Sequence, residues 1–201
     1  MTPQLCDPCE DRWPVKLHLG CGGVYLRGYV NCDLGGVLTT EPPPWATTPA
    51  DYYAGLNGEW NAIPEPPPVV VDAHCDIRCL GVVAEPFTAS KIIALQCLEH
   101  VDQDGARAAI REWYQSLAPD GVCIVTVPDV AETLEWLARP DRHAFAVRHL
   151  CGTHRHPNSW HRSFWTHSSL YEAMRAAGFD VEPIANPHFY PAACARGVKH
   201  G

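Results

Sequence analysis

Short apolar runs alternate with amphipathic stretches along most of this 201-residue chain. Apolar runs bounded by turn residues are typical of buried strands, and apolar residues spaced three and four apart are typical of helices. The runs predict strands over residues 15–19, 28–34, 69–71, 91–96, 122–127, 179–184 and 189–195. The three-and-four spacing predicts helices over residues 101–117, 130–137 and 168–177.

Strands that alternate with helices imply an α/β fold, in which a mostly parallel, doubly wound, Rossmann-like sheet forms one domain. The last helix has Thr166 or Ser168 as its cap and Gly178 as its stop. Residues 140–165, rich in histidine, arginine and aromatic residues, match neither pattern. We expect the domain to span residues 15–201, after an N-terminal extension over residues 1–14.

Residues 38–68 interrupt the pattern with two proline triplets, at 42–44 and 66–68. Proline cannot continue helices or central strands, so we expect an irregular, proline-rich insertion loop. Its aromatic residues Tyr52, Tyr53 and Trp60 could stack on a substrate or form a lid, or they could simply cover an open face of the sheet.

Composition narrows the classes of function. The formal net charge of −8 disfavours nonspecific binding to nucleic acids. No apolar run approaches the length of a membrane span, and the N-terminus lacks the apolar core of a targeting signal. We therefore expect a cytoplasmic protein without a membrane partner, whose ten cysteines are reduced thiols.

Ligands of parallel sheets bind at the carboxyl ends of the strands, and four predicted strands end in residues suited to a nucleoside. A glycine turn over residues 20–23 follows the first strand and lets a ligand approach the backbone closely. Asp33 ends the second strand, where a carboxylate can accept both ribose hydroxyls. Asp76 beside Ile77 could bind and cover an adenine, and Gln96 would face the ligand from the fourth strand.

In order and spacing, these elements resemble the class I S-adenosylmethionine-dependent methyltransferases, in particular a small type 11-like group. The motifs that carry the resemblance are LHLGCGG (17–23), GYVNCD (28–33), CDI (75–77), CLEHV (97–101) and LAPDGVCIVTVPD (117–129). Gly178 and Phe179 end the AAGF motif of the last helix, and the resemblance covers roughly residues 15–184.

The resemblance implies S-adenosyl-L-methionine as the cofactor and S-adenosyl-L-homocysteine as the product. The residues expected to bind the cofactor are His18, Gly20, Cys21, Gly22, Gly23, Asp33, Leu34, Asp76, Ile77, Gln96 and Cys97. His161 is the first candidate for a general base and His100 the second. His161 could instead hold its loop in place through backbone hydrogen bonds, and His100 could instead pack under the glycine turn. The acceptor is expected to be a small molecule or glycan, through a hydroxyl group.

Two features depart from the broad class. His18 stands where an acid often precedes the first glycine by two residues, which bears on how the methionine amino group is held. Residues 23–28 are too few for a full crossover helix, so we expect a reduced first helix.

Three other interpretations remain open. One is a structural zinc site, for which Cys6 and Cys9 are a ligand-spaced pair and residues 151–167 are rich in cysteine and histidine; we assign no metal ligands from sequence. Another is a non-catalytic module that binds S-adenosylmethionine as a scaffold. The third, a nucleotide-binding dehydrogenase, would need a G-x-G-x-x-G turn that residues 20–28 do not contain.

Overall fold

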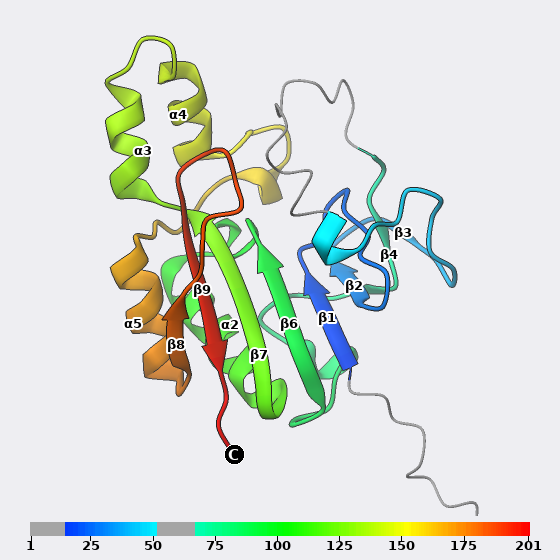
Figure 1. The fold of residues 1–201 in the computed structure, drawn as a ribbon. Coiled ribbons are helices and arrows are strands. Elements are labelled where there is room, and N and C mark those ends of the chain that lie inside the picture. Colours follow the sequence, from blue (N-terminus) through cyan, green and yellow to red (C-terminus); the bar gives the residue numbers. More distant parts are fainter. Residues whose placement is uncertain (1–14, 52–66) are drawn as a thin grey trace, which may run out of the picture.

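A seven-stranded sheet forms the centre of the computed structural model, which describes residues 15–51 and 67–201 (Figure 1). In spatial order its strands are β5 (Ala73–His74), β2 (Val30–Asp33), β1 (Val15–Leu19), β6 (Ala89–Leu95), β7 (Leu117–Pro128), β9 (Ala192–Val198) and β8 (Asp180–Pro183). The first five are parallel, whereas β9 runs antiparallel to both of its neighbours. The predicted fold class, a mostly parallel Rossmann-like sheet in a single domain, is therefore confirmed.

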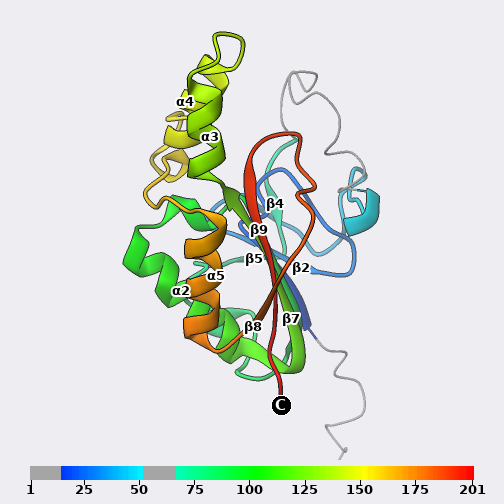
Figure 2. The same cartoon turned by 60° about the vertical axis from the view of Figure 1, so that its left-hand side comes forward.

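Helices α2 (Gln103–Ser116) and α5 (His167–Ala177) lie together against one face of the sheet (Figure 2). Helices α3 (Val130–Leu137) and α4 (His143–Cys151) pack on each other beyond the carboxyl edge of the sheet. Among the described residues, no helix combines the length and apolar character of a membrane span.

The central strand β6 shows why the core has two sides. Ile92 and Ala94 belong to the large core cluster that includes the buried face of α2, whereas Ile93 and Leu95 pack with Leu26 in a smaller cluster. Successive side chains of a strand point to opposite faces, so a continuous apolar run is what a strand buried on both faces requires.

The three predicted helices form within two residues of the expected ends. Asp102 caps α2 by accepting a hydrogen bond from the Gly105 amide, so this helix begins after residue 102. Thr166 caps α5 in a reciprocal arrangement with Ser169, and Gly178 ends the helix with φ +113°. Local capping chemistry therefore sets these ends as the sequence predicts.

The prediction that residues 69–71 form the third strand of the main sheet is wrong. Val70–Val71 forms β4, which pairs with β3 (Val37–Leu38) in a separate two-stranded sheet. The main sheet instead takes β5, at Ala73–His74. Its two residues contain no apolar run, so the hydrophobic pattern could not identify this strand.

The unassigned segment 140–165 contains α4 and the 3₁₀ turn η4 (Pro157–Ser159), and further turns η2 (Leu80–Val82) and η3 (Leu98–His100) follow β5 and β6. Tyr52, Tyr53, Trp60 and the N-terminal extension lie outside the described residues. The domain bounds and the insertion loop thus stay predictions.

Residues 20–29, between β1 and β2, form turns instead of a crossover helix, as the short spacing predicts. The fully buried side chain of Asn31 holds this connection. Its amide donates to the carbonyls of Leu26 and Tyr29, and its oxygen accepts from the Leu26 amide. Asp72 contacts both the side chain and the backbone amide of Asn31. The Asn31 side chain thus provides hydrogen-bond partners for backbone groups of Leu26 and Tyr29, which a crossover helix would pair within itself.

We predict that Asn31→Ala lowers the free energy of unfolding by about 2–4 kcal/mol, because several buried polar groups lose their partner at once. Urea unfolding followed by circular dichroism measures the change. Gln115→Ala removes an exposed side chain from α2 and should change the free energy by less than about 0.5 kcal/mol. Equal stability of the two variants would refute the role of Asn31.

Candidate functional site

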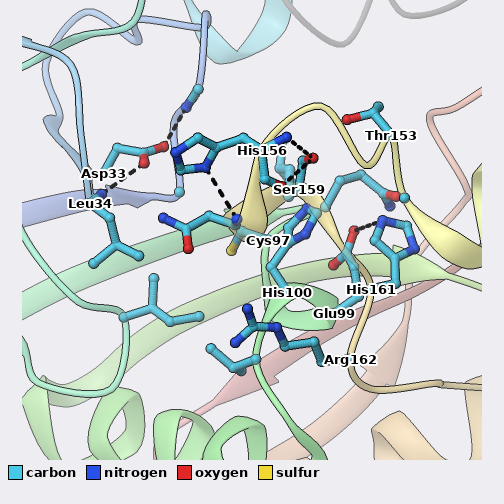
Figure 3. Close-up of a pocket in the computed structure, with 18 of the residues that line it drawn as sticks. Asp33, Leu34, Cys97, Glu99, His100, Thr153, His156, Ser159, His161 and Arg162 are labelled. Carbon is cyan, nitrogen blue, oxygen red and sulfur yellow. Dashed lines mark hydrogen bonds and ion pairs between the residues drawn. The ribbon is translucent and has the colours of Figure 1, made fainter.

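A cavity of about 600 Å³ lies at the carboxyl edge of the sheet. Its walls come from the loops after β1, β2, β5 and β6 and from residues of the 145–162 segment. Figure 3 shows Asp33 and Leu34 on one side, the Glu99, His100 and His161 side chains on the other, and Cys97 between them. A volume of this size is typical of a small-molecule or cofactor site.

The glycine turn over residues 20–23 lines the cavity. Gly20 has φ +61°, and a Cβ atom there would lie 2.3 Å from the Cβ of Cys97. Gly22 has φ +52° and donates its amide to Oδ2 of Asp33 at 2.9 Å. The turn therefore needs glycine at position 20 for two separate reasons, backbone conformation and space.

Asp33, at the end of β2, lines the cavity with a carboxylate in a fixed orientation. Its second oxygen, Oδ1, accepts the Leu34 amide at 2.7 Å. Leu34 itself is exposed and also lines the cavity. Two backbone amides thus orient the carboxylate, and a carboxylate has further lone pairs with which to accept ligand hydroxyls.

Asp76 and Ile77 also line the cavity, but the Asp76 carboxylate already has a partner. Arg78 binds it through Nε at 2.9 Å and Nη2 at 2.6 Å, and this pairing lowers the pKa of Asp76. Ile77 is nearly buried, and its carbonyl accepts the indole of Trp113 in α2. The adenine role predicted for Asp76 stays a prediction, in competition with Arg78.

Gln96 and Cys97 form the wall after β6, as the sequence predicts. Gln96 has φ +52°, an uncommon value for a residue with a side chain. Its side-chain amide nitrogen, Nε2, lies 3.3 Å from Oγ1 of Thr126. Burial raises the pKa of Cys97 well above its ordinary value, so this side chain is a neutral thiol. It packs against the turn at Gly20.

His18 is absent from the walls of the cavity, contrary to expectation. Its side chain is buried, and Nδ1 lies 3.0 Å from the Asn31 oxygen. Burial lowers the pKa of His18 to about 4, so the imidazole is neutral. The side chain of His18 belongs to the Asn31 network, whereas its expected contact with the cofactor came from its position in the family motif and stays a prediction.

Glu99, His100 and His161 form a compact group, here called the Glu–His cluster, at the other end of the cavity. Each of the three residues offers one atom that could ligate a metal, and these three atoms all lie within 4.8 Å of one another. Nε2 of His161 is 4.0 Å from Oε1 of Glu99 (dashed in Figure 3), and the rings of His100 and His161 meet edge to face at 4.9 Å. The structure thus brings together the two histidines that the sequence nominated separately.

Main-chain hydrogen bonds from residues late in the sequence bring His161 to the cluster. The carbonyl of Glu99 accepts the amides of Arg162 and Ser163 at 2.7 and 3.1 Å. Burial alternates along this segment, with Ser163 and Trp165 buried and Arg162 and Phe164 exposed. This extended stretch therefore directs His161 inward.

Burial makes both the carboxyl group of Glu99 and the imidazole of His161 neutral near pH 7. Burial raises the pKa of Glu99 to about 8. Burial, together with His100 and His149 nearby, lowers the pKa of His161 to about 4. Among the described residues, Oε2 of Glu99 is one of two buried side-chain polar atoms without a hydrogen-bond partner. Such an atom at a cavity wall is unusual and marks the site as incomplete.

Several residues that line the cavity were not predicted from the sequence. Glu99 had no role beyond its place in the CLEHV motif, and no role was predicted for Phe145, Arg148, His149 and Tyr190, which also line the cavity. These come from α4 and from the loop before β9, where no motif signals a site. The burial of Ser163 and the exposure of Phe164 run against their polarity, so the sequence around His161 gave no signal either.

The histidines of residues 151–167 do not converge on a common point. His154 bonds the Cys151 carbonyl, His156 caps η4, and His167 bonds Asp129 at the start of α5. In the part of the chain that the structure describes, only His161 of this stretch joins a group with metal-ligand spacing. Cys6 and Cys9 lie outside the described residues.

Comparisons with known proteins bear on this fold and cavity. A family model described as "Methyltransferase domain" matches residues 41–184, which is more than half of the chain. A search of curated proteins found no match.

Solved structures also match. One is a Haloferax volcanii protein described as a methyltransferase, in complex with the Trm112 methyltransferase activator: 14% identity, TM-score 0.54, covering 96% of this chain and 85% of that chain. Another is the S-adenosylmethionine-dependent methyltransferase SibL: 16% identity, TM-score 0.51, covering 92% and 50%. A third is a Burkholderia thailandensis 1,6-didemethyltoxoflavin-N1-methyltransferase with bound S-adenosylhomocysteine: 19% identity, TM-score 0.49, covering 93% and 71%. The chain spans half or less of the first three structures found. At these identities the likeness concerns the fold.

We predict that acid destabilises the protein through His18. A histidine whose pKa falls from 6.5 to about 4 on folding contributes stability that is present above pH 6.5 and lost as the pH falls toward 4. Between pH 7 and pH 5 this loss is about 2 kcal/mol. Urea unfolding at both pH values measures it. His18→Leu is expected to be less stable than the wild type at pH 7, but its free energy of unfolding should fall by less between pH 7 and pH 5. An equal fall in both proteins would contradict the role of His18.

We predict that Gly20→Ala deforms the glycine turn and abolishes ligand binding in the cavity, because the new methyl group would overlap Cys97. Gly35→Ala is the matched control, since a Cβ there meets no atom within 4 Å. Calorimetric titration with S-adenosylhomocysteine compares the two variants, and circular dichroism checks that both are folded. Unchanged affinity in Gly20→Ala would show that the ligand does not depend on the turn.

Proposed function

The chain belongs to the family of methyltransferase domains and its cofactor is S-adenosylmethionine, and we propose that it transfers the methyl group to a hydroxyl oxygen of a small molecule or sugar. One observation carries the proposal: a single cavity is lined by the glycine turn and Asp33 at one end and by the Glu–His cluster at the other. A cofactor and an acceptor could therefore meet inside one enclosure.

The cofactor end fits a nucleoside bonded to an amino acid. The backbone at Gly20 and Gly22 offers close approach without side chains. Asp33 presents a carboxylate oriented by two amides, which suits a ribose diol. Leu34 and Ile77 supply apolar surface beside it for a purine ring. No other described part of the cavity combines these features.

The acceptor end differs in chemistry. The Glu–His cluster supplies nitrogen and oxygen atoms that can accept or direct a proton, whereas Phe145 and Tyr190 supply aromatic surface nearby. A hydroxyl must lose its proton when its oxygen becomes alkylated, so proton-handling groups at this end favour an oxygen acceptor. The cofactor, when bound, supplies a methyl group already activated by its sulfonium.

In the proposed reaction the acceptor oxygen forms a bond to the methyl carbon while the carbon–sulfur bond breaks. The electron pair of that bond goes to sulfur, which becomes the neutral thioether of S-adenosylhomocysteine. The hydroxyl proton leaves through the Glu–His cluster to solvent. The chain contributes alignment of the two reactants and exclusion of water, which are the main sources of rate for such a displacement.

We predict that wild-type protein binds both S-adenosylmethionine and S-adenosylhomocysteine in calorimetric titration, and that Asp33→Asn weakens both about 10- to 100-fold. Hydrogen bonds to a charged group are typically stronger by about that factor than those to a neutral one. Asp104→Asn, on the exposed start of α2, is the matched control and should bind normally. No binding by the wild type would sink the proposal.

A second experiment, an activity assay, tests which class of acceptor the protein methylates. Production of S-adenosylhomocysteine is followed with a panel of sugars, phenols and aliphatic alcohols, and with amines of similar shape. Turnover with hydroxyl compounds supports the proposed acceptor. Turnover restricted to amines would overturn the hydroxyl assignment while leaving methyl transfer in place.

A further inference from the structure

The buried carboxyl group of Glu99 lies beside two imidazoles, and one of its oxygens has no hydrogen-bond partner among the described residues. The residue is 1% exposed, and Oε2 has no hydrogen-bond partner among the described residues. Its other oxygen lies 4.0 Å from Nε2 of His161, too far for a hydrogen bond. A buried carboxyl oxygen that accepts no hydrogen bond is costly, so a missing partner is the simplest physical account of Oε2.

The main chain positions both histidines of the cluster, His100 through its ring and His161 through its backbone amide. Nδ1 of His100 lies 3.1 Å from the carbonyl of Trp160. The main chain of His161 is fixed by its amide, which donates to the Cys151 carbonyl at 3.1 Å, and Nε2 of its ring faces Glu99. Histidines that ligate metals usually donate their second ring nitrogen to a carbonyl or carboxylate, as His100 does, which fixes the tautomer and the direction of the free nitrogen.

We propose that Glu99, His100 and His161 bind a divalent transition-metal ion. Two imidazoles and one carboxylate are a common ligand set for such ions, and imidazole favours them over magnesium and calcium. Ligand atoms about 2.1 Å from an ion lie roughly 3 to 3.5 Å apart. The three donor atoms lie within 4.8 Å of one another, so small side-chain rotations bring them to that spacing.

Three protein ligands leave coordination positions open, and the cluster lines the cavity. An ion there would take an acceptor oxygen as a further ligand and lower the pKa of that hydroxyl, in place of direct proton removal by His161. This use of the ion rests on the proposed methyl transfer. The metal site itself does not, because it depends only on the three ligands.

Manganese is the probe of choice because this chain has ten cysteines, whose thiols would capture zinc or cobalt. Mn²⁺ prefers oxygen and nitrogen donors, and electron paramagnetic resonance counts the free ion directly. The titration compares the wild type with Glu99→Gln and His161→Ala. His143→Ala is the matched control, since His143 is an exposed histidine that does not line the cavity.

We expect one Mn²⁺ per chain in the wild type and in His143→Ala, with at least tenfold weaker binding in Glu99→Gln and His161→Ala. Titration of the same four proteins with S-adenosylhomocysteine establishes that each is folded. Equal Mn²⁺ binding by all four, or no stoichiometric binding by the wild type, overturns the metal site. Loss of S-adenosylhomocysteine binding by the wild type would instead refute the proposed function and leave the metal result standing.

Discussion

The amide side chain of Asn31 is the interaction on which the cavity depends. It takes over the backbone pairing that a crossover helix would provide between β1 and β2, and so allows these parallel strands to be joined by turns. The register that follows places Asp33 opposite the glycine turn, where it accepts the Gly22 amide. His18 and Asp72 complete the same network from neighbouring elements.

A second set of main-chain bonds assembles the opposite end of the cavity. The carbonyl of Glu99 accepts two amides from a segment about sixty residues later in the chain, which fixes that segment in place. Gly152 is required nearby because a Cβ atom there would lie 2.0 Å from the carbonyl oxygen of Ser159. The cofactor end is thus built from adjacent strands, whereas the acceptor end is built from contacts distant in sequence.

This difference explains why the cofactor end of the cavity could be predicted from the sequence and the acceptor end could not. Asp33 and the glycine turn were predictable, because strand periodicity and the sheet rule place all strand ends at one edge. Thr166 and Gly178 were predictable as helix ends because capping is local. The strand β5 was missed, since a two-residue strand leaves no periodic signal. The hydrogen bond of His18 to Asn31 was not predicted, because the family motif shows only that a polar residue precedes the glycine turn. The grouping of Glu99 with His161 depends on tertiary pairing, which no local pattern encodes.

The short connection between β1 and β2 also bears on the order in which the chain can fold. Residues 20–29 close a small loop, and each doubling of loop length adds about 0.6 kcal/mol of chain entropy. The pairing of β1 with β6, by contrast, must bring together residues about seventy positions apart. Parallel strands are ordinarily slow to pair because their connections are long. Here the two strands beneath the glycine turn form a local unit that can serve as a template for the rest of the sheet.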